Sequence, residues 1–584
     1  MRTLLRLMVF ARKYRGWLLL AFICLITTTA SSMAIPWILG EAIDTVVSQG
    51  ERSFLILAVV VVLGAAALRG ISAYGHSYLS DIVSQKTSYD IRNALYDRLQ
   101  RLSFAYHDKA QTGQLMSRAT ADVEAIRMFF GRGLLGTVQM LILFVGISYI
   151  LVSIDWQLAL FTLAFLPVVG WRAVATGLRL RAMWLKIQEL MAALGITLEE
   201  SLTGIRVVKA FARQKEESQK FSTDAKVLYN EHISIARQWA FNVPLMVFLI
   251  SLPAALVLWY GGRQVIAGSL TIGGLTQFIL YLGMLAMPVR RLGFMANLFS
   301  RTISAGQRIL EILDTQSLIQ ENPNAIELGS LKGQVCFEDV SFSYNSMAPA
   351  LKKITFSVQP GELVALVGSS GSGKSTIARL IPRFYDVSSG HLTVDGVDIR
   401  DVTIASLRKN VVAVQQDVFL FSATIRDNIA FGAVNASMEQ IIAVAKIAHL
   451  HDFVQSLPDG YDTWVGERGT TLSGGEKQRL AIARTLLTNP RILILDDSTS
   501  NVDAETEYLI RQALGRLIKG RTTFIITHRL PIIKNADLIL VLKEGQIVEQ
   551  GRHSDLMTRD GLYQQIYQSQ LSVTQDSGGS LIEE

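Results

Sequence analysis

A glycine-rich loop carries the clearest chemistry in this sequence. It lies between an apolar, buried-type strand over 364–367 and a helix that is expected to begin at Lys374. Glycine lets the backbone turn its N–H groups inward, and a helix N-terminus adds positive potential, so the arrangement favours phosphate. Lys374 should reach the β- and γ-phosphates of a nucleoside triphosphate, and the Ser375 hydroxyl should bind Mg²⁺. The residues predicted to bind the nucleotide here are Gly368, Ser369, Ser370, Gly371, Ser372, Gly373, Lys374, Ser375 and Thr376.

A second apolar strand, expected over 492–495, ends at two adjacent carboxylates. The first of them, Asp496, is expected to hold Mg²⁺ through water. The second, Asp497, follows directly. Together with the glycine-rich loop, these residues predict a site for a nucleotide and its metal ion.

A third motif is the run LSGGEKQ, residues 472–478, which opens a helix at Ser473. Its hydroxyl and amide groups make a second anion-binding helix end. This run resembles the LSGGxQ signature of ATP-binding cassette (ABC) proteins, and the glycine-rich loop and the 492–497 segment resemble their Walker A and Walker B motifs. The chain is similar to half-size ABC exporters, in which six membrane spans precede one cassette, and the resemblance covers nearly its whole length.

The resemblance implies roles for residues that would be unremarkable alone. Tyr344 matches the aromatic residue that stacks on adenine, and Asp503 matches the acidic position of the D-loop. Gln416, after a strand over 411–414, matches the glutamine that touches Mg²⁺ or the attacking water, and His528 matches the switch histidine that contacts the γ-phosphate. In ABC dimers, the signature faces the γ-phosphate that the other subunit holds, which assigns Ser473, Gly474 and Gly475 to a partner's site.

The sequence departs from the family at Asp497, where a catalytic glutamate is usual. An aspartate is one methylene shorter, and a misplacement near 1 Å can cost about 100-fold in rate. The resemblance therefore predicts a degenerate ATP site with catalytic residues Asp497, His528 and Gln416, and metal-binding residues Ser375, Gln416 and Asp496. The alternative is that Asp497 still acts through a shifted water.

The first half of the chain predicts a membrane domain. Half of all residues are hydrophobic and 18% are charged, and up to about residue 310 the apolar residues form runs of about 20, enough to cross a bilayer. The second run is overlong and should continue as helix into the cytoplasm. The net charge of +7 lies largely in loops that flank these runs, which favours a membrane surface over nucleic acid. Six spans are predicted, at 17–39, 54–83, 129–153, 157–178, 241–262 and 272–294.

Long basic segments at 84–128 and 179–240 place both termini in the cytoplasm, because excess Lys and Arg stay inside. Both segments resemble exporter loops whose coupling helices dock onto the cassettes; without the family they are solvated helical hairpins. Residues 1–15 could be an interfacial elbow helix or an extension of the first span. In the elbow helix, the side chains expected to face lipid are Leu4, Leu5, Leu7, Met8 and Phe10. Four arginines within the even-numbered spans could line a basic cavity or reach the cytoplasmic interface. They are Arg69, Arg172, Arg290 and Arg291.

These observations predict a polytopic α-helical membrane domain, with six transmembrane helices and long cytoplasmic extensions, fused to an α/β P-loop ABC nucleotide-binding domain. The expected boundaries are 1–311 for the membrane domain, 312–332 for a linker, 333–573 for the cassette and 574–584 for a disordered acidic tail.

By resemblance, the expected function is ATP-driven export of amphipathic small molecules, drugs or lipids across the cytoplasmic (inner) membrane of a bacterium. The expected partner is a second, non-identical half-transporter that carries the catalytic glutamate. Three alternatives stay open: a homodimeric exporter with slow ATPase, an importer of siderophores with the exporter fold, and an ATP-gated regulatory subunit.

Overall fold

The computed structural model describes residues 2–49, 52–344, 349–414, 418–433, 435–466, 469, 471–496, 504–527 and 529–579. It divides into two compact units. The membrane unit comprises Met1–Arg101 and Gln111–Thr315, and the cassette unit comprises Leu102–Ala110 and Gln316–Glu584. The short segment Leu102–Ala110 thus belongs with the cassette, although the chain on both sides of it belongs to the membrane unit.

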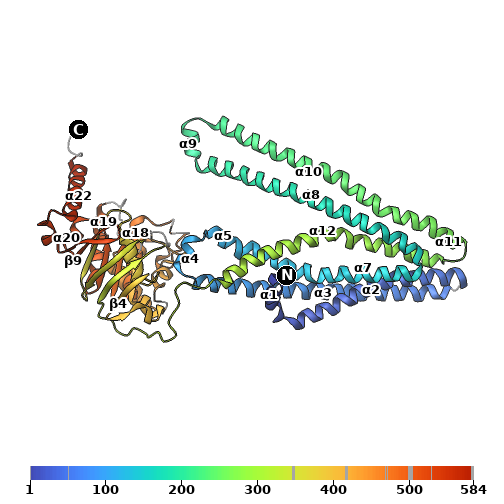
Figure 1. Ribbon diagram of the computed structural model, residues 1–584, viewed down its shortest axis with the longest axis horizontal. Coiled ribbons are helices and arrows are strands. Elements are labelled where there is room, and N and C mark those ends of the chain that lie inside the picture. Colours follow the sequence, from blue (N-terminus) through green and yellow to red (C-terminus); the bar gives the residue numbers. More distant parts are fainter. Residues whose placement is uncertain are drawn as a thin grey trace. The chain divides into compact units, whose positions relative to one another are not determined.

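The membrane unit is entirely helical in its described part (Figure 1). Among the residues that the structure describes, five helices are long and apolar enough to cross a membrane, and a shorter apolar stretch, Ile272–Leu285, begins α12, where the sixth span is predicted. As expected, the second span continues as one helix, α3, to Arg101. The helices are α1 Arg2–Arg12, α2 Arg15–Gln49, α3 Arg52–Arg101, α5 Thr112–Ser117, α6 Val123–Met128, α7 Leu134–Ile154, α8 Trp156–Thr203, α9 Ile205–Ala210, α10 Gln214–Leu256, α11 Gly262–Ile266 and α12 Ile272–Asp314.

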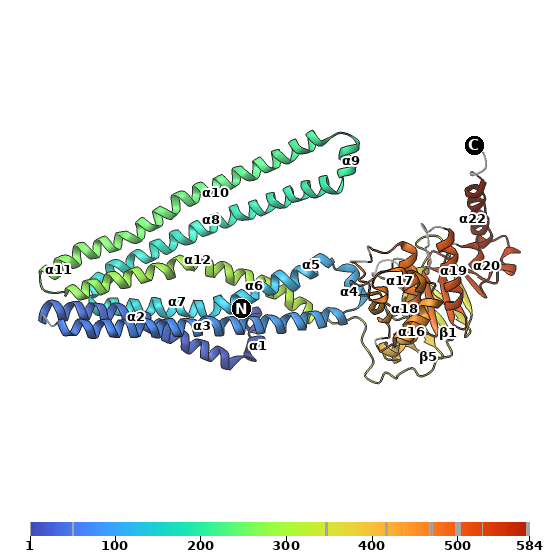
Figure 2. The same cartoon turned by 180° about the vertical axis from the view of Figure 1, so that it is seen from behind.

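Three π-helical turns interrupt these helices: η1 Arg118–Asp122, η2 Phe129–Gly133 and η3 Val257–Gly261. A π turn leaves the regular i→i−4 hydrogen-bond pattern, and such turns occur often at functional sites. Both views show α8 and α10 side by side as a long hairpin with α9 at its tip (Figures 1 and 2).

The elbow segment forms a helix of its own, α1, separate from α2, so the alternative of one continuous first span is wrong. Leu7 is not turned to lipid. It is fully buried in a cluster with Ile91 of α3 and Ile309 of α12, while Leu5 on another face is 63% exposed. Leu7, near the middle of α1, thus packs against α12 instead of lipid. Burial against protein removes this apolar side chain from water, just as burial in lipid would.

The cassette unit contains two sheets. A six-stranded sheet has the order β10-β9-β3-β8-β7-β6, in which β10 is antiparallel and the other neighbours run parallel. An antiparallel sheet has the order β2-β1-β4-β5. The strands are β1 Val335–Phe342, β2 Leu351–Val358, β3 Leu363–Gly368, β4 Ser389–Val394, β5 Val397–Asp398, β6 Val411–Val414, β7 Ile492–Asp496, β8 Thr522–Ile526, β9 Leu538–Lys543 and β10 Gln546–Gly551.

The six-stranded sheet is buried on both faces because its strands alternate side chains between two cores. Ala365 and Val367 of β3 face one core, whereas Val364 and Leu366 face the other. The helices of this unit are α4 Phe104–Lys109, α13 Lys374–Leu380, α14 Ile404–Asn410, α15 Ile425–Ala430, α16 Met438–Ile447, α17 His451–Ser456, α18 Gly474–Thr488, α19 Ala504–Ile518, α20 Leu530–Lys534, α21 His553–Met557 and α22 Leu562–Gly579, with short 3₁₀ turns at η4 Ile399–Asp401 and η5 Gly460–Asp462. Helix α22 continues past residue 574, where the sequence predicts a disordered tail.

Candidate nucleotide-binding site

The carboxyl ends of four parallel strands meet at one edge of the large sheet. Ile526 of β8 pairs with Leu366 of β3 on one side and with Asp496 of β7 on the other. Val414, at the end of β6, pairs with Leu495. The glycine-rich loop, which follows β3, therefore lies at the same edge as Asp496. Ligands of open α/β sheets bind at this edge.

Three glycines of the loop adopt backbone conformations that other residues rarely adopt. Their φ angles are +151° at Gly368, +78° at Gly371 and +109° at Gly373. A Cβ at Gly368 would lie 2.3 Å from the carbonyl oxygen of Leu542, and one at Gly373 would lie 2.7 Å from Cδ2 of Leu351. Glycine at these two positions is thus required both by conformation and by space.

The Lys374 side chain folds back into the loop. Its Nζ donates hydrogen bonds to the carbonyl oxygens of Gly368 and Ser369, both at 2.8 Å, and the residue is 8% exposed. Burial lowers the pKa of Lys374, and the nearby Asp496 carboxylate acts in the opposite direction. The two carbonyl oxygens thus hold the Lys374 ammonium inside the loop, where the phosphate oxygens of a bound nucleotide would contact it.

The loop also holds a buried hydroxyl, Ser372 Oγ, that has no hydrogen-bond partner among the described residues. An unpaired buried polar atom costs free energy, and an anionic ligand oxygen would satisfy it. The loop therefore fits a chain of phosphates. It combines a tightly turned glycine backbone, the Lys374 ammonium and this unpaired hydroxyl. Ser375 is exposed at the start of α13, and Asp496 is half-buried at the end of β7, at the same edge of the sheet as the loop, so these two residues would hold Mg²⁺ beside the phosphates.

Tyr344 lies beside the first turn of α13. Its hydroxyl donates to Thr376 Oγ1 at 3.3 Å, and its ring meets Phe342 and Tyr385 edge-on, at centroid distances of 4.8 and 5.1 Å. The residue is 40% exposed, so part of its ring is free to stack on a base. The predicted adenine contact and the predicted phosphate loop are thus neighbours.

The signature motif begins α18 through a capping box. Ser473 Oγ accepts from the Glu476 N–H at 3.4 Å, and a Glu476 carboxylate oxygen accepts from the Ser473 N–H at 2.7 Å. These bonds fix the first turn of the helix. Ser473 and Gly474 are exposed, whereas Gly475 is buried. The predicted anion-binding end is therefore formed and accessible in a single chain.

Four predicted site residues, Gln416, Asp497, Asp503 and His528, lie outside the described residues. The described strand ends β6, β7 and β8 lead directly into the first, second and last of them. Their roles stay predictions.

Sequence reasoning missed one contact near the site. Phe104 of α4 stacks on Phe384, with ring centroids 4.3 Å apart, and the Tyr385 hydroxyl donates to the Asp108 carboxylate. Burial, then this hydrogen bond, raises the pKa of Tyr385. Tyr385 also contacts Tyr344, so α4 is one residue removed from the predicted adenine platform. The adjacent aromatic residues Phe384 and Tyr385, in the turn after α13, are the sequence feature that could have indicated this contact.

Comparison with known proteins agrees with this architecture. The family model described as ABC transporter transmembrane region matches residues 18–289, and that described as ABC transporter matches residues 351–500. An ATP-dependent lipid A-core flippase of Syntrophus aciditrophicus (strain SB) is 37% identical over 97% of this chain and 94% of its own length. A putative multidrug export ATP-binding/permease protein of Bacillus subtilis (strain 168) is 36% identical over 97% of this chain and 99% of its own length.

Among solved structures, a bacterial Atm1-family ABC exporter with ATP bound matches with a TM-score of 0.79 and 30% identity, over 95% of this chain and 98% of that chain. The predicted fold class is thereby confirmed: an α-helical membrane domain is fused to an α/β nucleotide-binding cassette. With its apolar helices, its phosphate loop and its signature helix in one chain, this protein belongs to the ABC transporter family and is an ATP-driven membrane exporter of that family.

Proposed function

We propose that this chain is one subunit of a heterodimeric exporter whose two ATP sites are unequal. The observation that carries this proposal is the combination of Asp497, where the family has a glutamate, with an intact, capped signature helix at Ser473. The chain's own Walker motifs then form the degenerate site. Its signature serves the site whose glutamate lies on the partner.

The loop residues bind and orient the nucleotide at this degenerate site. Lys374 and the loop amides hold the phosphates, Tyr344 holds the base, and Ser375, Asp496 and Gln416 would hold Mg²⁺, which neutralises phosphate charge. ATP held between two cassettes favours their closure, since the nucleotide contacts both faces only in the closed state. Asp497 holds an attacking water less well than a glutamate because its carboxylate stops one methylene short.

An exposed apolar helix supports a partner subunit. Helix α9, at the tip of the α8–α10 hairpin, buries none of its residues. Val207 is 61% exposed, and Phe211, directly after the helix, is 74% exposed. Apolar groups at a hairpin tip, far from the predicted spans, favour a protein surface as their cover. In the proposed dimer, α9 docks on the partner's cassette, and α4 couples to its own.

The proposed substrates are amphipathic small molecules, drugs or lipids. The names of two similar proteins, a lipid A-core flippase and a putative multidrug exporter, support this class. The proposed location is the bacterial inner membrane with both termini in the cytoplasm, which the basic segments at 84–128 and 179–240 support.

The decisive experiment compares the Mg²⁺-dependent ATPase rate of the purified chain with that of Asp497→Glu. We expect the native chain to be nearly inactive and the variant to gain roughly 10- to 100-fold, since the longer carboxylate regains its reach. Brisk hydrolysis by the native chain alone would instead favour a homodimeric exporter. Asp555→Asn, at an exposed aspartate of α21, is the matched control and should leave the rate unchanged.

A further inference from the structure

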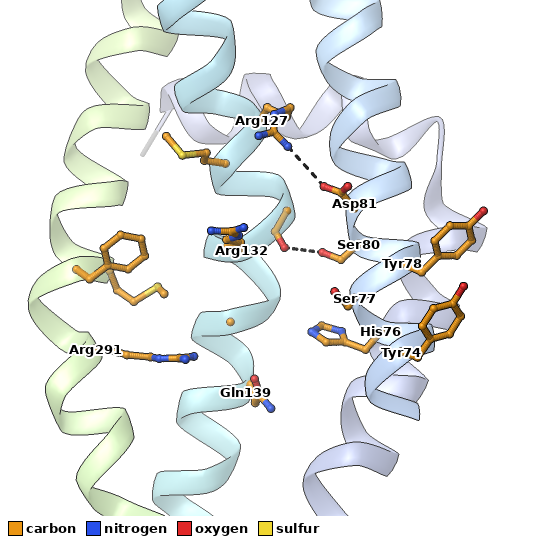
Figure 3. A pocket seen from close by; sticks show the side chains of 15 residues that line it. Tyr74, His76, Ser77, Tyr78, Ser80, Asp81, Arg127, Arg132, Gln139 and Arg291 are labelled. Atoms are coloured by element: carbon orange, nitrogen blue, oxygen red, sulfur yellow. Dashed lines mark hydrogen bonds and ion pairs between the residues drawn. The ribbon is translucent and has the colours of Figure 1, made fainter. Parts of the chain in front are cut away.

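The membrane unit contains a cavity of roughly 800 Å³ between α3, the α6–η2–α7 segment and α12 (Figure 3). Its polar lining includes His76, Gln139, Arg127, Arg132 and Arg291. In Figure 3, Arg291 reaches from α12 toward α7, and His76 points from α3 toward the same helix, whereas Tyr74 and Tyr78 point away. Side chains from three helices therefore converge on one space.

The positive charges in this cavity are not balanced by the chain itself. Arg127 is paired, because its guanidinium meets Glu124 at 2.6 Å and Asp81 at 3.5 Å. Arg132 and Arg291 form no ion pair with any described residue. The cavity lining contributes one aspartate and three arginines, so two cationic groups lack a counter-charge. Guanidinium groups that lack a counter-charge beside the hydrocarbon favour an anion as their neighbour, which points to an anionic occupant.

The π turn η2 sets the position of Arg132. The residue lies between Gly131 and Gly133, within Phe129–Gly133. The Ser80 hydroxyl of α3 donates to the Gly131 carbonyl at 2.6 Å, which fixes the turn to the neighbouring helix. A Cβ at Gly133 would lie 3.0 Å from Cδ2 of Leu298 on α12, so the turn is also close to the third helix. The π turn thus fixes the backbone on both sides of Arg132 against the neighbouring helices.

The depth of the cavity matches the inner lipid headgroups, given the proposed topology. Arg291 follows the start of α12 at Ile272 by about 19 residues, or roughly 28 Å at the helical rise. Gln139 lies roughly 22 Å from the external end of α7 at Ile154. The hydrocarbon core is about 30 Å thick. Arg291 therefore lies at the inner edge of the hydrocarbon. Arg132, roughly 33 Å from Ile154, lies at the inner headgroup layer, and Gln139 lies roughly 8 Å inside the hydrocarbon.

We propose that this cavity binds the anionic group of an amphiphile, a phosphate or carboxylate carried on an acyl chain, through Arg132 and Arg291. The proposal rests on the proposed export of amphipathic substrates and specifies their charge. The planar guanidinium groups suit two oxygens of one phosphate or carboxylate, and His76 and Gln139 add hydrogen-bonding groups on the remaining sides. The acyl chain extends past Gln139 into the hydrocarbon.

The test is binding of two single-chain lipids to the full-length protein in detergent, without nucleotide, measured by native mass spectrometry. Palmitoyl lysophosphatidic acid should bind at least about tenfold more tightly than palmitoyl lysophosphatidylcholine, whose headgroup carries a compensating positive charge. Arg132→Gln and Arg291→Gln should each weaken binding of the anionic lipid about tenfold and leave the zwitterionic lipid unaffected. Arg291→Lys should retain most of the affinity, because it retains the charge.

Arg237→Gln is the matched control, since Arg237 is an exposed arginine of α10 outside the cavity lining, and it should change binding by less than about twofold. Equal binding of the two lipids, or native affinity in both glutamine variants, would overturn the proposal. Displacement by an equal concentration of inorganic phosphate would also overturn it, because the site would then take a free anion. ATP binding by each variant verifies folding, and the Asp497→Glu comparison tests the unequal ATP sites separately.

Discussion

At the scale of single residues, Asp398 of the cassette is a carboxylate with a strongly shifted pKa. Asp398 accepts hydrogen bonds from the Arg400 N–H, Nε and Nη2, and it lies 3.0 Å from His391 Nδ1. Burial alone would raise its pKa, but these hydrogen bonds outweigh burial and lower the pKa of Asp398 to about 2. A depressed carboxyl pKa stabilises the fold at every pH above the pKa of the unfolded chain.

We expect Asp398→Asn to destabilise the cassette by about 2 kcal/mol at pH 7. The difference between native protein and variant should shrink as the pH falls from about 4 toward 2, because the native carboxylate is then protonated. Thermal unfolding followed by intrinsic fluorescence at pH 7 and pH 3 measures this. A difference that is the same at both pH values would show that Asp398 acts through packing rather than charge.

At the scale of elements, α4 is held to the cassette by an aromatic contact. Phe384 stacks on Phe104 on one side, and the Arg408 guanidinium lies 5.2 Å from its ring centroid. Phe384→Ala removes both contacts. We expect hydrogen exchange of the α4 amides to become roughly tenfold faster, since opening of α4 then costs less free energy.

Hydrogen–deuterium exchange with mass analysis of peptides covering 104–109 measures this change. Tyr508→Ala, at an exposed tyrosine of α19, is the control and should leave the exchange of α4 as it is in the native chain. If the α4 amides exchange at the native rate in Phe384→Ala, then the connection of α4 to α3, and not its contact with the cassette, keeps this helix ordered.

Elements with strong local signals were predictable. Strands expected over 364–367, 411–414 and 492–495 correspond to β3, β6 and β7, and α13 begins at Lys374 as predicted. Apolar β-branched runs bounded by glycine or charge specify such strands without long-range information. The degenerate-site roles assigned to Asp497, Gln416 and His528 stay predictions, since these residues lie outside the described part of the chain.

Features that depend on long-range packing were not predictable. No local pattern indicates that β8 lies between β3 and β7, or that Asp108 contacts Tyr385. Only the structure distinguishes the environments of the arginines in the predicted spans. Arg172 donates a hydrogen bond to Asn242 of α10 at 2.8 Å, whereas Arg291 lines the cavity. The side chain of Arg290 lies outside the described residues. Side-chain direction on a helix depends on neighbouring helices, which periodicity alone does not place.

At the scale of the whole molecule, the α8–α10 hairpin exposes a tip that a partner should cover. Arg206 and Lys209 of α9 are exposed, so trypsin should cut the isolated chain there. When the chain is purified together with its partner and trapped with a non-hydrolysable ATP analogue, we expect cleavage at these sites to slow at least about tenfold. Equal cleavage in both samples, read by mass spectrometry of the fragments, would argue against docking of α9 on a second subunit.

The π turn at η2 also bears on how related chains can diverge. Such a turn holds one residue more than an α-helical turn, so losing one residue between Phe129 and Gly133 can leave the faces of α6 and α7 nearly in place. What such a loss changes is the direction of Arg132. Deletion of a single codon is therefore a route by which a descendant removes one positive charge from the cavity, and so changes its range of cargo, without rebuilding either helix.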